Sequence, residues 1–343
     1  MRYNDCPLYC MQSKKQLCYL LKIKDKRLLK QDYVASLIEP YIKTSGKPRL
    51  IEPPREDLKS IQKRIKDALG KIVVPKNVFS GIKGRSYIDN ALFHIGLQPR
   101  YMYKVDLTAF FPSISRETVY GFFRNELRCS SDIAMILSNF TTIDLTKANL
   151  KDPSSVYDFL SAKGIKGNNH LLSGAPTSQI LSYLVNYEMF NEMQALADKH
   201  LVLMTIYVDD ITFSSTHKIS HRFQEQIIRI IKKYKYQVSR NKVKYYTKMY
   251  PKLITGVILS ANGKVAIKNS LRKKIIADHK CLRNNPDDLT SRKRLQGLVT
   301  AARQIQKDAY PSIYAFAFKK TKRTKKKRNP MYRERKIYES SVG

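Results

Sequence analysis

Apolar side chains recur at helical spacing in several stretches of this chain. Leu58, Ile61, Ile65 and Leu69 follow one another at intervals of three and four. This spacing predicts an amphipathic helix over about residues 56–70, whose other face carries Lys59, Lys63, Arg64 and Lys66. Those basic side chains meet phosphates or form a solvated face. Similar periodicity predicts helices within residues 1–40, 180–196 and 223–234, and again beyond residue 268.

Other segments have the pattern of strands. Residues 101–107 (YMYKVDL) alternate well enough for a strand that ends on an acidic residue. Apolar, β-branched runs at residues 201–206 and 211–213 predict two further strands. Residues 253–260 (LITGVILS) predict another strand, closed by the turn residues Asn262 and Gly263. The proline pair at positions 53 and 54 makes residues 47–54 a short extended segment.

Two adjacent carboxylates stand between two of these predicted strands, in the sequence Tyr207-Val208-Asp209-Asp210. The pattern places them at a hairpin tip. Two ionised groups so close repel each other, and burying them is costly unless a cation compensates. A divalent ion such as Mg²⁺ is the natural partner, while a solvated Asp-Asp turn is the alternative.

Composition points to a polyanionic partner. The 343 residues include 64 Lys and Arg against 28 Asp and Glu, giving a net charge of +36 and a pI near 10.0. No apolar run approaches the ~20 residues of a membrane-spanning helix, so nucleic acid fits better than a membrane. Residues 319–328 carry eight basic side chains in ten, which predicts a polyanion-binding tail or helix extension. The charged N-terminus lacks the apolar stretch of a signal peptide, so we expect a cytoplasmic protein.

The five cysteines predict no structural zinc. They include no CxxC pair, and no histidine cluster has zinc-ligand spacing. Reduced thiols are the expected state of a cytosolic chain.

Asp106 ends its predicted strand about a hundred residues before the Asp209-Asp210 pair. A strand ending in Asp106, a long helical excursion, a hairpin carrying the pair and a further strand give the order of a nucleotidyl-transfer palm. Two-metal phosphoryl transfer needs carboxylates that bridge ions about 3.5–4 Å apart, and neighbouring strands of one rigid sheet can supply them.

Five segments together resemble bacterial reverse transcriptases of the retron type. VDLTAFFPSI (105–114), SGAPTS (173–178) and YVDD (207–210) resemble the three catalytic motifs in order, and ITGVILS (254–260) resembles the primer-grip region. NALFH (90–94) matches the NAxxH pattern that separates retron enzymes from other reverse transcriptases. The resemblance covers residues 47–260 and continues more weakly beyond them.

This resemblance implies an α+β, right-hand polymerase fold. A helical N-terminal extension would occupy residues 1–40. Fingers and an antiparallel-sheet palm would occupy residues 41–267, and a helical, basic thumb residues 268–343.

The resemblance also implies roles for individual residues. Asp106, Asp209 and Asp210 would be the catalytic carboxylates and would hold two Mg²⁺ ions, which Mn²⁺ can replace, with the Leu107 carbonyl touching the metal on the triphosphate side. Phe111 would act as a steric gate against a 2′-OH. The remaining nucleotide contacts would come from Arg49, Lys59, Arg85, Gly174, Ala175 and Lys242, the last of which would donate a proton to pyrophosphate or contact a phosphate. Retron-specific RNA contacts would involve Asn90, His94, Thr255 and Gly256, although His94 taken alone fits a hydrogen-bonded structural histidine.

The sequence departs from the family pattern at three places. Ser173 replaces a polar amide that normally touches the incoming nucleotide, and Gln179 replaces a proline. Val208 stands where retron enzymes commonly have alanine, so we expect it against the primer end.

The function implied by the resemblance is RNA-directed DNA synthesis within a retron. The enzyme would copy a structured, msr-msd-like non-coding RNA into single-stranded DNA from deoxynucleoside triphosphates. Priming from a 2′-OH of that RNA would leave branched msDNA, and an effector protein would complete an anti-phage defence system. The alternatives are a group II intron-like or diversity-generating reverse transcriptase, and a non-catalytic basic RNA-binding scaffold.

Overall fold

The computed structural model describes residues 1–319, so the predicted basic segment 319–328 lies outside the described residues apart from Lys319. The chain divides into two compact units, and the boundary falls between Lys268 and Asn269.

The first unit begins with short helices, as the sequence predicts. They are α1 (Lys14–Leu21), the 3₁₀ helix η1 (Lys26–Leu29) and α2 (Gln31–Ser36). A small hairpin follows, formed by β1 (Tyr41–Lys43) and β2 (Arg49–Ile51), which confirms the extended segment. The amphipathic helix is also confirmed: α3 spans Glu56–Leu69 and buries all four apolar residues that predict it.

A mainly helical region lies, in the sequence, between α3 and the hairpin that carries Asp209 and Asp210. The run at 180–196 is helical as predicted, but residues 185–186 divide it into α8 and α9. Besides β3 of the central sheet, the elements of this region are α4 (Tyr87–Leu92), α5 (Arg116–Gly121), the π-helix η2 (Phe122–Glu126), α6 (Ser131–Thr141), the short strand β4 (Thr142–Asp144), α7 (Pro153–Ala162), the short strand β5 (Asn169–Leu171), α8 (Ser178–Leu184) and α9 (Tyr187–Lys199).

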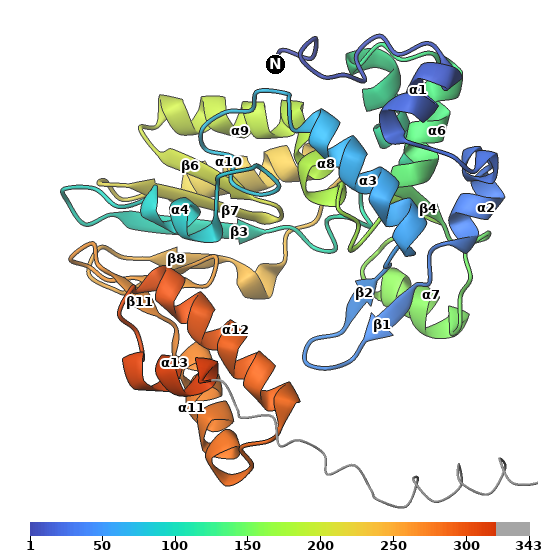
Figure 1. The fold of residues 1–343 in the computed structure, drawn as a ribbon. Helices are drawn as coiled ribbons and strands as arrows, with labels where there is room; N and C mark the ends of the chain where they lie inside the picture. The colour runs from blue at the N-terminus through green and yellow to red at the C-terminus, as the bar shows by residue number, and fades with distance from the viewer. Residues whose placement is uncertain (320–343) are drawn as a thin grey trace, which may run out of the picture. The chain divides into compact units, whose positions relative to one another are not determined.

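Four antiparallel strands form the central sheet, in the order β6-β7-β3-β8. They are β3 (Tyr101–Asp106), β6 (Leu203–Tyr207), β7 (Asp210–Ser215) and β8 (Lys244–Tyr246), so the three strands predicted before residue 214 are confirmed. The helices α9 and α10 (His221–Lys233) run along one side of this sheet (Figure 1). Because α4 also packs on β6, β7 is buried along most of its length. A strand covered on both faces is a rigid support for polar groups at its end.

A second sheet follows the short 3₁₀ helix η3 (Arg240–Lys242) and β8 in the sequence. It contains β9 (Lys252–Ile254), β10 (Val257–Leu259) and β11 (Val265–Ile267). The prediction of one strand over residues 253–260 is therefore wrong: Thr255 and Gly256 form a hairpin turn, with φ of 44° and 95°. The predicted turn at Asn262 and Gly263 is confirmed, since it joins β10 to β11.

The second unit is helical, which confirms the pattern predicted beyond residue 268. It contains α11 (Asn269–Asn284), α12 (Leu289–Ile305) and α13 (Pro311–Phe318). Arg294 of α12 ties the helices together through two 2.7 Å hydrogen bonds to Asp278 of α11.

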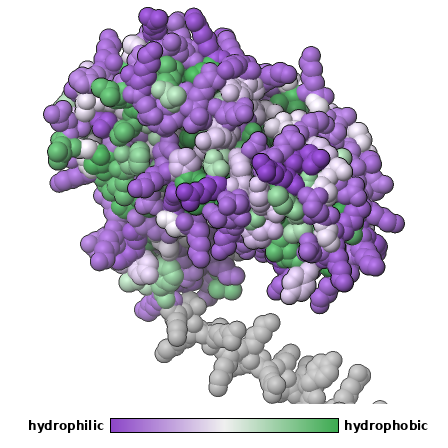
Figure 2. Space-filling view, turned by 90° about the horizontal axis from the view of Figure 1, so that it is seen from above, coloured by the Kyte–Doolittle hydropathy of each residue, from purple (hydrophilic) through white to green (hydrophobic). Residues whose placement is uncertain are grey.

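Hydrophilic side chains cover most of the face of the molecule that Figure 2 shows. Within residues 1–319, none of the helices combines the length and apolar character needed to cross a membrane.

Candidate active site

The central sheet brings the three predicted carboxylates together at one end of its strands. Asp106, the last residue of β3, lies directly opposite Asp210, the first residue of β7. Asp210 also pairs with Tyr207 of β6, so Val208 and Asp209 form the two-residue tip of a tight hairpin. The backbone N–H of Leu107 donates a 3.0 Å hydrogen bond to the Asp209 carbonyl, which ties the tip to the end of β3. Residues about a hundred positions apart thus meet at the same end of two neighbouring strands.

The hairpin tip is strained at its first residue. Val208 has φ of 58°, in the left-handed region that β-branched residues rarely adopt. A two-residue loop between twisted antiparallel strands requires this geometry, which glycine or asparagine usually supplies. The Ser80 hydroxyl accepts a 2.9 Å hydrogen bond from the Val208 N–H and so holds the tip from a neighbouring loop.

Two lysine ammonium groups lie on the carboxylates. Lys242 Nζ is 2.8 Å from Asp106 Oδ1 and 2.6 Å from Asp106 Oδ2. Lys104 Nζ is 2.8 Å from Asp210 Oδ2, and it also donates a 3.1 Å hydrogen bond to the Leu253 carbonyl of β9. Sequence reasoning names Lys242 but not Lys104. Lys104 could have been found from its position two residues before Asp106, because side chains two apart in a strand lie on the same face.

The electrostatics of the site favour a cation. Burial, helped by the nearby Asp106 carboxylate, raises the pKa of Asp209 to about 6. Burial also raises the pKa of Asp106, while its hydrogen bond to Lys242 acts in the opposite direction. Hard carboxylate oxygens are the ligands that Mg²⁺ prefers, so the donor set fits the ion. Within residues 1–319, no group of three acidic, histidine or cysteine side chains is arranged as a metal site, and the ammonium groups of Lys104 and Lys242 form ion pairs with Asp210 and Asp106.

Phe110 and Phe111 follow the β3 carboxylate and differ in their surroundings. Phe110 is buried and packs edge-on against Phe190 and Tyr236. Phe111 is half-buried at the rim of the core and stacks on Phe110, with ring centroids 6.3 Å apart. The steric-gate assignment of Phe111 stays a prediction, and its partial exposure leaves a ring face for such a contact.

A buried network fixes the loop that contains Ser173, Gly174 and Ala175. Both carboxylate oxygens of the fully buried Glu52 are used: one is 2.8 Å from His170 Nε2 and the other accepts a 2.7 Å hydrogen bond from the Ser173 N–H. Gly174 has φ of 121°, and the backbone of Glu52 would lie 3.9 Å from an added Cβ. Sequence reasoning missed Glu52, because its partners lie 118 and 121 positions away and no local pattern marks it.

Two segments for which the resemblance implies RNA contacts meet each other in the structure. Asn90 of α4 donates a long, 3.4 Å hydrogen bond to the Thr255 hydroxyl, which in turn donates a 2.7 Å hydrogen bond to the Tyr87 carbonyl. Gly256 follows at the tip of the β9–β10 hairpin. Residues 165 positions apart in sequence thus form one contact between α4 and that hairpin.

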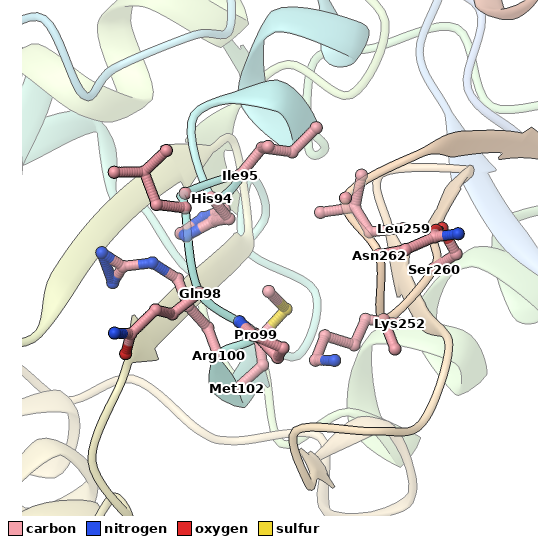
Figure 3. A pocket seen from close by; sticks show the side chains of 14 residues that line it. His94, Ile95, Gln98, Pro99, Arg100, Met102, Lys252, Leu259, Ser260 and Asn262 are labelled. Carbon is pink, nitrogen blue, oxygen red and sulfur yellow. The ribbon is translucent and has the colours of Figure 1, made fainter.

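His94 is a structural histidine. Its Nδ1 is 2.8 Å from the Ser214 hydroxyl of β7 and its Nε2 is 2.8 Å from the Thr205 hydroxyl of β6. Burial, with the positive charges of Arg100 and Lys104, lowers the pKa of His94 to about 3, so the ring is neutral. A cavity of about 180 Å³ lies beside it, bordered by residues 94–100 and by the β10–β11 turn (Figure 3).

The predicted triphosphate contacts lie on separate elements. Arg49 is exposed on β2, and Lys59 on α3 has a 3.6 Å ion pair with Glu56. The Nη1 of Arg85 donates 2.6 Å hydrogen bonds to the carbonyls of Pro75 and Val78, so part of this guanidinium supports a loop. The structure leaves these three roles, and the contact of the Leu107 carbonyl with metal, as predictions.

Comparison with known proteins agrees with this arrangement. The family described as reverse transcriptase (RNA-dependent DNA polymerase) matches residues 41–273. The retron Se72 reverse transcriptase of Salmonella heidelberg (strain 579083-10) is 27% identical over 242 residues, covering 67% of this chain and 54% of that protein. The retron Mx65 reverse transcriptase of Myxococcus xanthus is 26% identical over 220 residues, covering 64% of this chain and 49% of that protein.

The chain spans about half the length of these two relatives. Among solved structures, telomerase from Candida albicans in complex with a TWJ fragment of telomeric RNA aligns with 84% of this chain and 56% of that chain, with 10% identity and a TM-score of 0.44. The family match covers more than half of the sequence and contains all three carboxylates. The chain therefore belongs to the reverse transcriptase (RNA-dependent DNA polymerase) family, and its similar proteins are of the retron type.

Proposed function

We propose that this chain is the RNA-directed DNA polymerase of a retron. The observation that carries the proposal is the register of the central sheet, which sets Asp106 directly opposite Asp210 and puts Asp209 at the adjoining hairpin tip. In the polymerase assignment, this sheet is the palm, α3 with the β1–β2 hairpin belongs to the fingers, and residues 268–343 form the thumb.

The three carboxylates would hold two Mg²⁺ ions, or Mn²⁺ in their place. When bound, such ions lower the pKa of the attacking hydroxyl and neutralise the charge on the leaving pyrophosphate. Metal occupancy requires the ammonium groups of Lys104 and Lys242 to move off Asp210 and Asp106. The displaced Lys242 would then donate a proton to pyrophosphate or contact a phosphate oxygen.

Nucleotide selection would rest on residues around the carboxylates. The half-buried ring of Phe111 would exclude a 2′-OH, and Arg49, Lys59 and Arg85 would hold the triphosphate. The Glu52 network would keep the backbone at Gly174 and Ala175 in place beside the nascent base pair.

The retron assignment adds a substrate and a product. The template would be a structured, msr-msd-like non-coding RNA, primed from one of its own 2′-hydroxyls, and the product would be branched msDNA. The contact between Asn90 and Thr255, next to Gly256, joins the two retron-specific segments and supports this assignment, as do the retron relatives. An effector protein would be the partner in anti-phage defence.

Primer extension tests the proposal. In Mg²⁺, the wild type should extend a DNA primer on an RNA template, and Asp209→Asn should lower the rate by at least about 10²–10³-fold while RNA binding changes little. Asp158→Asn, an exposed position on α7, is the matched control and should retain full activity.

Three results would contradict the proposal. Undiminished extension by Asp209→Asn would refute the carboxylate mechanism, and a wild type without extension activity would favour the non-catalytic scaffold. On the cognate RNA, linear DNA without a 2′,5′ linkage would replace the retron assignment with a group II intron-like or diversity-generating enzyme.

A further inference from the structure

An acid-free, basic stretch of the first unit leads away from the candidate active site. Residues 226–268 contain eleven Lys and Arg and no Asp or Glu. Within this stretch β8 forms an outer strand of the central sheet, where it pairs only with β3. Lys244 of β8 lies opposite Lys104, whose ammonium group contacts Asp210. From this point β8 runs antiparallel to β3, along the outer side of the sheet, back toward Tyr101 at the start of β3.

The turn that follows β8 presents large apolar side chains to solvent. Met249 is 72% exposed and Tyr250 is 68% exposed. They stand between Lys248 and Lys252, and a lysine recurs at every fourth position along residues 244–252 (KYYTKMYPK). Lys248 Nζ lies 5.5 Å from the centroid of the Tyr101 ring, which keeps its charge on the β3–β8 surface.

A buried lysine holds this turn in shape. Lys252 is only 4% exposed, and its Nζ donates 2.8 Å hydrogen bonds to the carbonyls of Lys248 and Tyr250. In Figure 3 the Lys252 side chain extends from the second sheet into the cavity, toward Pro99 and Met102. Burying an ammonium group is costly, and burial lowers the pKa of Lys252. The two hydrogen bonds of this ammonium group hold the backbone of the turn in one conformation. The exposed side chains of the turn are therefore presented to solvent in a fixed arrangement, as expected of a binding surface.

We infer that the segment 244–252, here called the β8 turn, is a contact surface for the nucleic-acid duplex at the active site. Met249 and Tyr250 lie against bases or sugars, and Lys244 and Lys248 against phosphates. Six extended residues span at most about 20 Å, so Tyr250 is within the reach of a few nucleotides from Lys244. In a duplex the base faces are already stacked, so an exposed ring packs against sugars and groove edges while ammonium groups neutralise phosphates, which gives contact without reading the sequence. The inference rests on the proposed function, because it takes the polymerase substrate as the ligand.

Equilibrium binding tests the inference without requiring catalysis. The probe is a fluorescent RNA template annealed to a DNA primer, titrated with the full-length protein at several salt concentrations. Tyr250→Ala should raise Kd about fivefold or more, and Tyr250→Phe, which keeps the ring, should bind like the wild type. Lys244→Gln and Lys248→Gln should each reduce the slope of log K against log salt by up to about 0.9.

Matched controls separate the surface from general effects. Tyr19→Ala removes an even more exposed ring (88% exposed) from α1, and Lys199→Gln removes an exposed charge from α9. Both should bind the duplex like the wild type. The exposed positions of the β8 turn tolerate substitution, and equal melting temperatures would verify that the variants fold.

The inference fails if Tyr250→Ala binds the duplex as tightly as Tyr19→Ala does, or if the salt slope is the same for Lys244→Gln, Lys248→Gln and Lys199→Gln. Failure of the proposed function is a different result. A wild type that binds the duplex but does not extend the primer refutes the polymerase proposal and leaves the binding comparison intact.

Discussion

His94 makes the stability of the first unit depend on pH. The ring is almost completely buried against side chains of β6 and β7, and burial lowers its pKa from the ordinary 6.5 to about 3. Between these two pH values the unfolded chain binds a proton that the folded protein excludes, so stability falls as the pH falls. Each pH unit below 6.5 costs about 1.36 kcal/mol, so lowering the pH from 6.5 to 5 should cost about 2 kcal/mol through this residue alone.

Urea unfolding of the full chain at pH 7, 6.5, 6 and 5 measures this cost. Other titrating groups also contribute, so the comparison is with His94→Gln, whose amide can hydrogen-bond to both hydroxyls but does not titrate. The stability difference between the two proteins should be constant from pH 7 to about 6.5 and should then shift by about 2 kcal/mol in favour of the variant by pH 5. Parallel pH profiles would refute a neutral, buried His94.

Three further predictions concern the candidate site. Phe111→Ala should lower the preference for deoxynucleotides over ribonucleotides by at least about tenfold, measured as the ratio of kcat/KM values, whereas Phe110→Leu should leave the ratio unchanged. Glu52→Ala leaves the Ser173 N–H and His170 Nε2 without their partner, at about 1–3 kcal/mol each, and urea unfolding should show the loss; unchanged stability would contradict the network. Lys242→Gln should lower kcat by about 10²-fold with little change in duplex affinity if Lys242 is the proton donor, and a change in affinity alone would assign it to phosphate binding.

The local pattern of the sequence predicts the elements that carry the carboxylates. The alternation over residues 101–107 and the apolar runs on either side of the Asp pair give β3, β6 and β7 within a few residues of their observed ends. The prediction of a single strand over residues 253–260 is wrong, because one apolar, β-branched run can form either a single strand or two strands of three residues. Only the positive φ at Thr255 and Gly256 separates the two, and threonine gives little sign of it.

The partners of the carboxylates could not be predicted in the same way. Lys242 lies 136 positions from Asp106, and Lys104 lies 106 positions from Asp210. The pairing register of the strands decides which of these distant residues meet in space. That register depends on side chains from all the strands at once. Lys104 and Lys242 are two among 64 basic residues, so charge alone does not distinguish them. The Glu52 network is hidden for the same reason, since its members come from two segments that are 118 or more positions apart.

The hairpin tip shows how the fold and the chemistry are connected. Val208 holds a φ that costs about 1–3 kcal/mol for such a residue, and the Ser80 hydroxyl and the paired strands on either side offset that cost. A relaxed, longer turn would remove the strain but would also break the pairing of Tyr207 with Asp210, and with it the register that sets Asp210 opposite Asp106. The strain at Val208 therefore accompanies the geometry that brings the three carboxylates together. It lies at the residue where the sequence departs from the alanine common in retron enzymes, so the primer end should meet a bulkier and more rigid surface here than in those enzymes.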